Sequence, residues 1–563
     1  MNQNSSINPA TRVDIANRMH QLFPTLDEAQ FALMSRYGQR RHFRAGELMF
    51  AQGQRHIAMY VVIAGTIRLE RSSALGSYVM GTHGAGRFTG EVGTLAGRAA
   101  VATATAQTDC DVLEIPEEAL RTLVITEAEL SETIMRAFIL RRVSFINDQS
   151  GGVILIGSQQ SGDTLKLRGF LARNAQPVAY FDREVHPETE DVMARFGVTA
   201  DEMPAVVTVD GTVLKRPTMR ELADAIGLSP DNLHDRSFDL VVVGAGPAGL
   251  AAAVYAASEG LSVAVLDKKA PGGQAGSSSK IENYFGFPTG VSGQALAGRG
   301  LSQARKFGAE VAVPCDVVKL SCLDVSDTFD IFIDSGELIH ARSVVVATGA
   351  RYRKPDLAEL ERFEGRGVYY SASFMEANLC AGEDVVIVGG GNSAGQAAVF
   401  LAGHVRHVHI VVRADGLAAS MSHYLIQRIE AASNITLHTQ TQIVSLHGAT
   451  QLESIHWQQR GGAPAPLPVR HLFLFLGAQP NTAWLRGCVA LDDKNFVLTG
   501  AQLPAGAWPL ERAPHFLETS RPRIFAVGDV RSGSVKRVAA GVGEGSAAVQ
   551  SLHMVLAEAG GAA

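Results

Sequence analysis

The chain has 563 residues, of which 46% are hydrophobic and 19% charged, and its formal net charge at pH 7 is −6. This length exceeds a single core, because domains usually span about 100–200 residues, so several compact units are expected. The weak negative charge excludes a general attraction to nucleic acid or anionic membranes, and no apolar run reaches the ~20 residues that span a bilayer.

The N-terminal stretch and the cysteine spacing both indicate a cytoplasmic protein. The N-terminal stretch M-N-Q-N-S-S-I-N-P lacks the basic-then-apolar pattern of a signal peptide. No two of the five cysteines form a C-x-x-C pair, so neither a disulfide framework nor a zinc or other metal site is indicated. These cysteines are Cys110, Cys315, Cys322, Cys380 and Cys488. We therefore expect a cytoplasmic protein with reduced cysteines.

Residues 1–150 alternate short β-rich runs with glycine-containing turns. The runs lie at 42–50, 59–70 and 110–115, and this spacing predicts a small β-roll or barrel. A helical stretch at 127–143 closes the segment. A βα pattern then begins with G-V-I-L-I-G-S and runs to about residue 230, which predicts a second, smaller unit over residues 151–230.

A long α/β region follows, and it contains two strand–glycine–helix units. The first starts at F-D-L-V-V-V-G-A-G-P-A-G, and the second at D-V-V-I-V-G-G-G-N-S-A-G. The pattern of the first resumes at I-F-A-V-G-D-V, so one nucleotide-binding domain is inserted into another. We predict a multidomain α/β protein with Rossmann-like domains at 236–355 plus 478–563 and, inserted, at 356–477.

Three glycines at the first turn carry a specific dinucleotide signal. Gly244, Gly246 and Gly249 follow a buried strand and open a helix, where a backbone without side chains can approach a pyrophosphate at the helix N-terminus. About 20 residues further on, Asp267 follows the next strand and can accept hydrogen bonds from a ribose hydroxyl.

Further motifs resemble the FAD domain of low-molecular-weight thioredoxin reductases. They are P-G-G-Q at 271–274, I-E-N-Y-F-G-F-P at 281–288, A-T-G-A at 347–350, A-V-G-D-V at 526–530 and K-R-V-A-A-G at 536–541. The resemblance implies a homodimeric flavoprotein and a set of FAD-binding residues. These are Gly244, Gly246, Ala248, Gly249, Asp267, Gly273, Gln274, Asn283, Thr348, Gly349, Gly528, Asp529, Arg537 and Val538.

By the same resemblance, the second turn holds a nicotinamide dinucleotide. Its residues are Gly389, Gly391, Asn392, Ser393, Ala394 and Arg413. Relatives that use NADPH grip the 2′-phosphate with several arginines. This chain keeps Arg413 but has Ala414 and Ala418 at the later positions, with no acidic residue in place of Arg413. This favours NADPH and leaves NADH open.

The family's redox-active Cys-x-x-Cys is missing from its place before the second turn. Ser371 and Phe374 stand there, and neither side chain cycles between thiol and disulfide. We expect both residues to line the flavin face. Cys380 has no partner thiol nearby, and buried packing is the favoured interpretation.

Residues 151–230 resemble a thioredoxin or glutaredoxin fold that also lacks its dithiol. The loop after the first strand reads Ser158-Gln159-Gln160-Ser161, and the resemblance implies a cis peptide bond before Pro204. A thioredoxin-like unit ahead of a reductase resembles the flavoprotein subunit of alkyl hydroperoxide reductase, which relays electrons through two dithiols. Both are absent here.

The N-terminal pattern A-G-E-L-M-F, M-Y-V-V-I-A-G-T-I-R-L and G-E-V-G-T-L-A-G-R-A-A resembles a cyclic nucleotide-binding domain. In that family a short helix N-terminus and an arginine hold the cyclic phosphate, and a glutamate holds the ribose. The matching residues are Gly90, Glu91, Arg98 and Ala99. The interval from Glu91 to Arg98 is shorter than in well-known cAMP binders, so a degenerate scaffold domain is the alternative.

Together these patterns predict an FAD-dependent NAD(P)H oxidoreductase, regulated by a nucleotide at the N-terminal domain. Its electrons would pass to a quinone, a ferredoxin-like carrier, a partner protein or oxygen, with no binding to nucleic acid or membranes. One alternative is a signalling protein that senses NAD(P)H or redox state through FAD and turns over slowly. The other is a thioredoxin reductase that uses cysteines of a partner.

Overall fold

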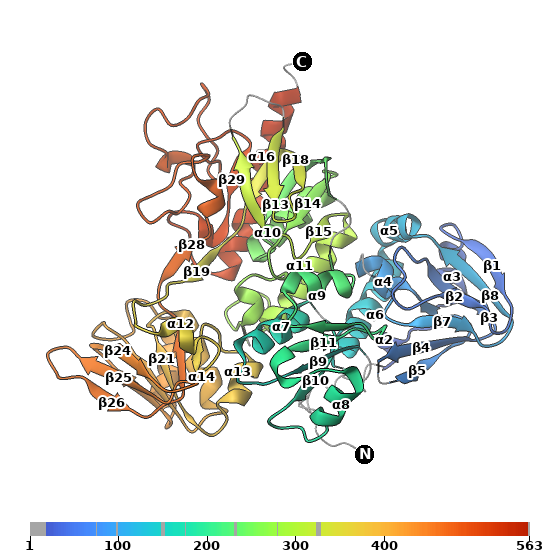
Figure 1. The fold of residues 1–563 in the computed structure, drawn as a ribbon. Helices are drawn as coiled ribbons and strands as arrows, with labels where there is room; N and C mark the ends of the chain where they lie inside the picture. Colours follow the sequence, from blue (N-terminus) through green and yellow to red (C-terminus); the bar gives the residue numbers. More distant parts are fainter. Residues whose placement is uncertain are drawn as a thin grey trace.

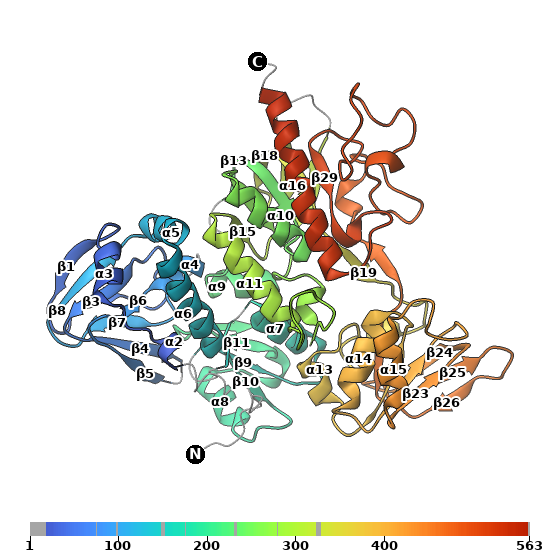
Figure 2. The same cartoon turned by 180° about the vertical axis from the view of Figure 1, so that it is seen from behind.

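The computed structural model describes residues 19–74, 76–96, 99–147, 152–174, 176–229, 233–278, 280–322 and 328–560. They form four units, which Figures 1 and 2 show from opposite sides. We call them the β-roll (19–147), the small α/β unit (152–229), the first Rossmann unit (233–355 and 478–560) and the inserted unit (356–477). The small α/β unit lies between the other three (Figures 1 and 2).

The β-roll consists of two four-stranded antiparallel sheets, ordered β1–β8–β3–β6 and β2–β7–β4–β5, with helices at one end. Its strands and helices are α2 (Met19–Leu22), α3 (Glu28–Met34), β1 (Gln39–Phe43), β2 (Leu48–Phe50), β3 (Met59–Ala64), β4 (Ile67–Ser73), β5 (Gly76–His83), β6 (Phe88–Thr89), α4 (Glu91–Ala96), β7 (Thr103–Ala106), β8 (Cys110–Ile115), α5 (Glu117–Thr126) and α6 (Ala128–Asn147). Both sheets contribute large apolar side chains to the core, such as Phe43 and Phe88.

The small α/β unit has one mixed sheet, ordered β10–β9–β11–β12, in which β9 and β10 are parallel and β11 is antiparallel to β9. Its elements are β9 (Val153–Gly157), α7 (Gly162–Arg173), β10 (Val178–Asp182), α8 (Thr189–Phe196), η1 (Ala200–Glu202), β11 (Ala205–Val207), β12 (Val213–Lys215) and α9 (Met219–Ala225). The peptide bond between Met203 and Pro204 is cis, as the thioredoxin resemblance implies.

The first Rossmann unit is built on a seven-stranded sheet, ordered β15–β14–β13–β18–β17–β16, with β29 paired to β18. Its elements are β13 (Arg236–Val243), α10 (Pro247–Ser258), β14 (Val263–Leu266), η2 (Ala275–Ser277), α11 (Gly293–Lys306), β15 (Glu310–Ala312), β16 (Val317–Ser321), β17 (Phe329–Ile333), β18 (Leu338–Val346), η3 (Ala483–Leu485), η4 (Gly500–Gln502), β29 (Ile524–Ala526), η5 (Gly528–Val530) and α16 (Val538–Gly560). Strand β13 ends in four buried apolar residues, as expected of a parallel strand covered on both faces.

The inserted unit has a five-stranded parallel sheet, ordered β20–β27–β21–β22–β23, and a three-stranded antiparallel sheet, β24–β25–β26. Its elements are α12 (Leu360–Phe363), β20 (Val368–Tyr369), α13 (Phe374–Leu379), β21 (Asp384–Val388), α14 (Asn392–Ala402), β22 (His407–Val411), α15 (His423–Ala431), β23 (Ile435–His438), β24 (Thr441–His447), β25 (Ser454–Gln459), β26 (Ala465–Leu467) and β27 (His471–Leu474). Two antiparallel strands, β19 (Ala350–Tyr352) and β28 (Ala478–Pro480), connect it to the first Rossmann unit.

The expectation that every cysteine is reduced is wrong for two of the five. Cys322, just after β16, and Cys488, just after η3, form a disulfide with their Cα atoms 5.4 Å apart. They are 166 residues apart in sequence, and only the packing of η3 against β16 brings them together. Cys110, Cys315 and Cys380 are free and buried.

Candidate functional site: two dinucleotide turns and a cavity in the β-roll

The first glycine turn leaves no room for side chains. Gly244 has a φ of +110°, and a Cβ atom built on it would lie 2.3 Å from the carbonyl oxygen of Ala347. A Cβ atom on Gly249 would lie 1.9 Å from the carbonyl oxygen of Gly244, so only glycine allows helix α10 to pack this closely against the turn. Gly246 is the N-cap of α10 and Pro247 its first residue, so the helix begins at the turn, and its N-terminus favours an anion there.

Asp267 braces the loop on the other side of this turn. One carboxylate oxygen accepts the amide N–H of Ala245 at 2.8 Å, and the other accepts those of Lys269 and Ala270 at 2.9 and 3.0 Å. These bonds fix the carboxylate at the end of β14, where the Rossmann fold binds a ribose. The adjoining Gly273 packs against Gly246, because a Cβ atom on Gly273 would lie 3.1 Å from the Gly246 Cα.

The opposite wall of the site comes from the second half of the first Rossmann unit. Thr348 and Asn481 exchange hydrogen bonds of 2.8 and 2.9 Å, which tie the Thr348–Gly349 loop to the segment after β28. Gly528 has a φ of +71°, and a Cβ atom on it would lie 3.0 Å from the Ala248 side chain. At Gly528 the two halves therefore approach so closely that a side chain would contact Ala248.

Glu544 holds the Gly528 turn and was not anticipated from the sequence. One of its carboxylate oxygens accepts the Gly528 N–H at 2.6 Å, and the other pairs with Arg531 at 2.6 Å. The only available signal was one acidic residue among the small residues of the first two turns of α16, whose other acidic residue, Glu558, lies near its end. Beside it, burial and the Glu544 charge raise the pKa of Asp529, which Lys536 opposes.

The remaining predicted FAD residues surround this turn. Arg537 and Val538 lie where α16 begins, and Arg537 is exposed. The Gln274 side chain donates to the carbonyl of Ala350, at the start of the β19 connection. Asn283 is exposed, and no hydrogen bond joins its side chain to the glycine turns in the described part of the chain. The narrow glycine-lined turn, the fixed Asp267 and the open N-terminus of α10 fit an FAD dinucleotide.

The second glycine turn repeats the first. A Cβ atom on Gly389, whose φ is +142°, would lie 2.6 Å from the Phe475 carbonyl oxygen, and Gly391 is the N-cap of α14. The Asn392 side chain accepts the Ser422 N–H at 2.7 Å, so it closes the loop after β22. Ala394 is fully buried, and Arg413 is exposed just after β22.

Tyr352 lies between the two Rossmann units, beside the second turn, and was not predicted from the sequence. It ends strand β19, between the two Rossmann units, and its hydroxyl is hydrogen-bonded to Ser393 of the second turn. Burial raises the pKa of Tyr352, and the charge of Asp529 from the first unit raises it further. This residue therefore connects the predicted nicotinamide turn with the predicted flavin site.

Ser371 makes its hydrogen bond within its own segment. Its hydroxyl donates to Glu376 at 3.3 Å, and Ser373 also donates to Glu376, through its amide N–H at 2.8 Å and its hydroxyl. Phe374 is the first residue of α13, which lies beside the small α/β unit in both views (Figures 1 and 2). The placement of Ser371 and Phe374 at a flavin face stays a prediction.

A cavity of about 330 Å³ opens inside the β-roll. Gly90 precedes it with a φ of +94°, and Glu91, the first residue of α4, is completely buried. A carboxylate oxygen of Glu91 pairs with Arg141 of α6 at 2.6 Å, a partner that the sequence did not reveal. Ala99 is partly buried nearby in sequence, while Arg98 lies outside the described residues.

The polar groups of this cavity retain unused hydrogen-bonding capacity. The other Glu91 oxygen, one terminal nitrogen of Arg141 and both ring nitrogens of His83 are buried without a partner among the described residues. Burial lowers the pKa of His83 to about 3, and the charges of Arg141 and Arg87 contribute. Because buried polar groups normally have partners, these groups fit a polar ligand inside an otherwise apolar cavity.

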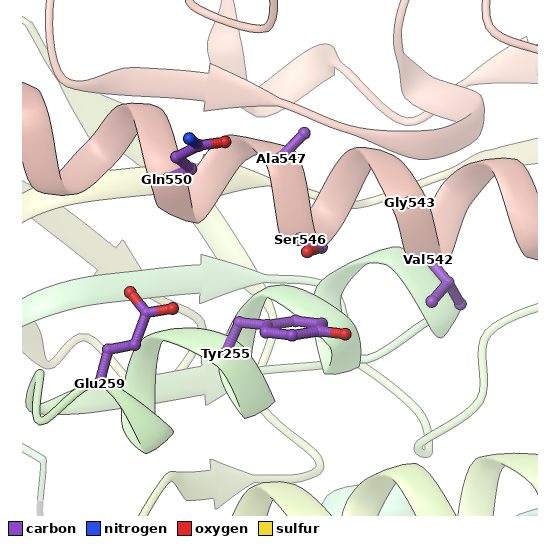
Figure 3. Close-up of a pocket in the computed structure, with 7 residues that line it drawn as sticks. All are labelled: Tyr255, Glu259, Val542, Gly543, Ser546, Ala547 and Gln550. Carbon is purple, nitrogen blue, oxygen red and sulfur yellow. The ribbon is translucent and has the colours of Figure 1, made fainter.

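A second hollow, of about 540 Å³, lies between α10 and α16 on the first Rossmann unit (Figure 3). Tyr255 of α10 and Glu259, the residue after α10, face Ser546 and Gln550 of α16 across it (Figure 3). It is lined by the later turns of α10, away from the glycines at its start. None of the helices in the described part of the chain is long and apolar enough to cross a membrane.

Two Rossmann units, each with a side-chain-free dinucleotide turn and joined by two antiparallel strands, define a flavoprotein oxidoreductase that uses a pyridine nucleotide. Residues 238–545, more than half of the chain, match the family model for pyridine nucleotide-disulphide oxidoreductases. The chain belongs to this family and is an FAD-dependent oxidoreductase. Residues 40–127 match the model of the cyclic nucleotide-binding domain, so the β-roll is such a domain.

Curated relatives and solved structures agree with this assignment. A thioredoxin reductase from Mycoplasmopsis pulmonis is 29% identical over 56% of this chain and 96% of its own length. NADPH-dependent thioredoxin reductase 3 from Arabidopsis thaliana is 32% identical over 61% of this chain and 65% of its own length. The structure of Lactococcus lactis thioredoxin reductase in its FR conformation matches 57% of this chain and 99% of its own, with a TM-score of 0.52 and 25% identity.

Proposed function

We propose that this protein oxidises NAD(P)H through FAD and passes the electrons to an acceptor other than a disulfide of its own. The observation that carries the proposal is the contrast between two intact dinucleotide turns and two dithiol positions without cysteine. Ser371 and Phe374 replace one dithiol, and the Ser158–Ser161 loop replaces the other. Both changes remove the same chemistry, because a hydroxyl cannot replace a thiolate as an electron carrier.

The remaining cysteines support this proposal. Burial raises the pKa of Cys315 and of Cys380 to about 12, so both stay protonated and unreactive near neutral pH. The Cys322–Cys488 disulfide follows β16, at the far edge of the sheet, and two strands, β18 and β17, separate β16 from the dinucleotide strand β13. Cys315 lies next to Asp267, whose carbonyl oxygen accepts the Cys315 amide N–H at 2.8 Å, but its thiol is buried and protonated.

The residues of the chain have separable tasks in this scheme. The α10 and α14 N-termini bind the two pyrophosphates, and Asp267 orients the ribose of FAD. FAD itself supplies hydride acceptance from NAD(P)H. Tyr352, held between Ser393 and the Asp529 side of the flavin site, excludes water between the two cofactors. The acceptor is then a quinone, a ferredoxin-like carrier, a partner protein or oxygen.

The nucleotide specificity and the effector complete the proposal. Arg413 supplies one cation for a 2′-phosphate, so NADPH is favoured over NADH without excluding it. The cavity with Glu91 and Arg141 binds a cyclic nucleotide that regulates flavin reduction. A cytoplasmic location and a homodimer stay predictions from the sequence.

Stopped-flow reduction of the purified flavoprotein by NADPH and by NADH tests the proposal, with and without cAMP or cGMP. We expect rapid flavin reduction, followed by repeated turnover with at least one member of an acceptor panel of quinones, ferredoxin and oxygen. Oxidised thioredoxin should not be reduced. A protein that cannot be reconstituted with flavin would contradict the flavoprotein assignment itself.

The slow redox sensor is the second candidate, favoured by the docking of the small α/β unit against both Rossmann units. Stoichiometric reduction that then stalls with every acceptor would support it. Disulfide reductase activity that disappears in Cys380→Ser would instead support reduction through partner cysteines.

A further inference from the structure

Helix α7 of the small α/β unit ends against the FAD loop of the first Rossmann unit. The Arg173 guanidinium donates from Nη2 to the Gly273 carbonyl oxygen at 2.9 Å. Two further hydrogen bonds hold the helix end in place: Gln294 of α11 donates to the Ala172 carbonyl at 3.0 Å, and the Asn174 amide donates to the Lys269 carbonyl at 3.1 Å. Figure 2 shows α11 descending onto α7. A residue from a different unit therefore reaches the cofactor loop.

The carbonyl that Arg173 holds is next to the pyrophosphate turn. Gly273 packs directly on Gly246, whose Cα would be 3.1 Å from a Cβ on Gly273. Gly246 is the N-cap of α10, which is where the FAD pyrophosphate binds in this fold. A single residue, Gly273, thus separates Arg173 from the turn at which the pyrophosphate binds.

The electrostatics of Arg173 indicate an unsatisfied cation. The side chain is largely buried, and this burial lowers its pKa, whereas the negative charge of Asp267 raises it. Arg173 forms no ion pair within 4 Å among the described residues, and its Nε has no hydrogen-bond partner. Asp267 uses both carboxylate oxygens on backbone amides of its own loop. A buried guanidinium normally pairs with a carboxylate or a phosphate. Among the described residues no carboxylate lies within the 4 Å of an ion pair with Arg173, and Asp267 acts on it only through its charge at longer range.

We propose that Arg173 is an FAD-binding residue that the small α/β unit contributes to the first Rossmann unit. Its guanidinium neutralises and hydrogen-bonds the FAD pyrophosphate. The small α/β unit, which lacks a dithiol, then acts as part of the cofactor site. This inference rests on the family's use of FAD and not on the identity of the electron acceptor.

FAD binding to the apoprotein, followed by flavin fluorescence, tests the proposal without any turnover. We expect Arg173→Gln to weaken FAD binding by about tenfold to a hundredfold, the loss of a charge-assisted hydrogen bond. Arg173→Lys keeps the charge, so its affinity for FAD should fall between those of the wild type and Arg173→Gln. The matched control is Arg168→Gln on the same helix, because Arg168 lies over the Tyr180 ring, 4.7 Å from its centroid, inside the small α/β unit. It should bind FAD like the wild type.

A measurement on the wild type covers the case in which Arg173→Gln does not fold. FAD should slow hydrogen exchange in the last turn of α7, residues 170–174, and leave β12 of the same unit unchanged. Equal FAD affinity of folded Arg173→Gln and wild type would overturn the proposal, and so would unchanged exchange in α7 on FAD binding. If the wild-type apoprotein binds no FAD at all, the family cofactor assignment fails instead, which is a distinct result.

Discussion

Arg413 is the only residue predicted to bind the 2′-phosphate of NADPH at the second dinucleotide turn. It is exposed after β22, and Ala414 and Ala418 occupy the positions where relatives carry further arginines. We expect Arg413→Ala to lower kcat/KM for NADPH about tenfold, because one charge-assisted contact to the 2′-phosphate is lost. The kcat/KM for NADH should change less than twofold.

Steady-state kinetics with both nucleotides checks this expectation. Arg406→Ala is a suitable control, since Arg406 is an exposed arginine of the same unit that pairs with Asp384 at 2.8 Å. Parallel losses with NADPH and NADH in Arg413→Ala would show that Arg413 does not read the phosphate.

His83 makes the stability of the β-roll depend on pH. Its folded-state pKa is lowered to about 3, below an ordinary value of 6.5, by burial and by the charges of Arg141 and Arg87. The unfolded chain therefore binds a proton that the folded chain does not, and stability falls as the pH drops below the ordinary value. Between pH 7 and pH 5 we expect a loss of about 2 kcal/mol, which His83→Gln should largely remove.

Pulse proteolysis of the full chain in urea measures this effect. The tryptophans all lie in the Rossmann units, so fragments from residues 19–147 must report on the β-roll. The informative quantity is the difference between wild type and variant, because other titrating groups affect both alike. An identical pH dependence would refute the assignment to His83.

At the scale of elements, helix α7 bridges two parts of the catalytic module. Its C-terminal end holds the FAD loop, and its N-terminal residue, Gly162, touches the inserted unit at Gly365, between α12 and β20. A Cβ atom on Gly365 would lie 2.9 Å from the Gly162 Cα. Any rotation of the inserted unit must therefore change this contact with the small α/β unit.

Gly365→Ala should push the start of α7, at Gly162, away from the inserted unit. Gly382 offers a matched control, because its φ of +74° is almost the same as the +73° of Gly365, but nothing lies within 4 Å of its Cβ position. The two alanine variants share the backbone strain, and only Gly365→Ala adds the clash. We expect faster hydrogen exchange at residues 161–164 in Gly365→Ala alone. Equal exchange in both variants would mean that the contact is not a constraint.

The elements that sequence patterns predict well are those whose signal is local. The glycines at 244–249 and 389–394 each report a turn that side chains would block, and the structure contains both turns. Arg173, Tyr352 and the Cys322–Cys488 pair depend instead on contacts between distant segments. Arg173 is 100 residues from Gly273 in sequence, and nothing in the α7 pattern distinguishes it from a solvent-exposed helix residue. The roles of such residues can be recognised only once the packing of whole units is known.

At the scale of the whole molecule, helix α6 connects the β-roll cavity with the first Rossmann unit. Arg141 of α6 pairs with Glu91 at the cavity, and Ser131, ten residues earlier, accepts a hydrogen bond from Lys306 of α11 at 3.0 Å. At 1.5 Å per residue, the two contacts are about 15 Å apart on one helix. A shift of α6 on ligand binding would thus reach the unit that carries FAD.

Lys306→Met should uncouple the two sites. We expect the effect of a cyclic nucleotide on the flavin reduction rate to fall several-fold, while reduction without nucleotide stays near the wild-type rate. Lys319→Met, an exposed lysine of the same unit near the Phe332 ring, serves as control. The flavin reduction rate, measured by stopped flow with and without a saturating concentration of the cyclic nucleotide, decides between the outcomes. Undiminished regulation in Lys306→Met would exclude this route.

The Cys322–Cys488 bond has a topological consequence. The inserted unit, residues 356–477, lies entirely within the stretch that this bond closes into a ring. One backbone cut anywhere in that ring would leave two polypeptides that still migrate as a single species until a reductant separates them. The same closure restricts the unfolded chain by an amount on the order of 5 kcal/mol in the chain-entropy model. The inserted unit is thus closed into a covalent loop by a bond within the first Rossmann unit.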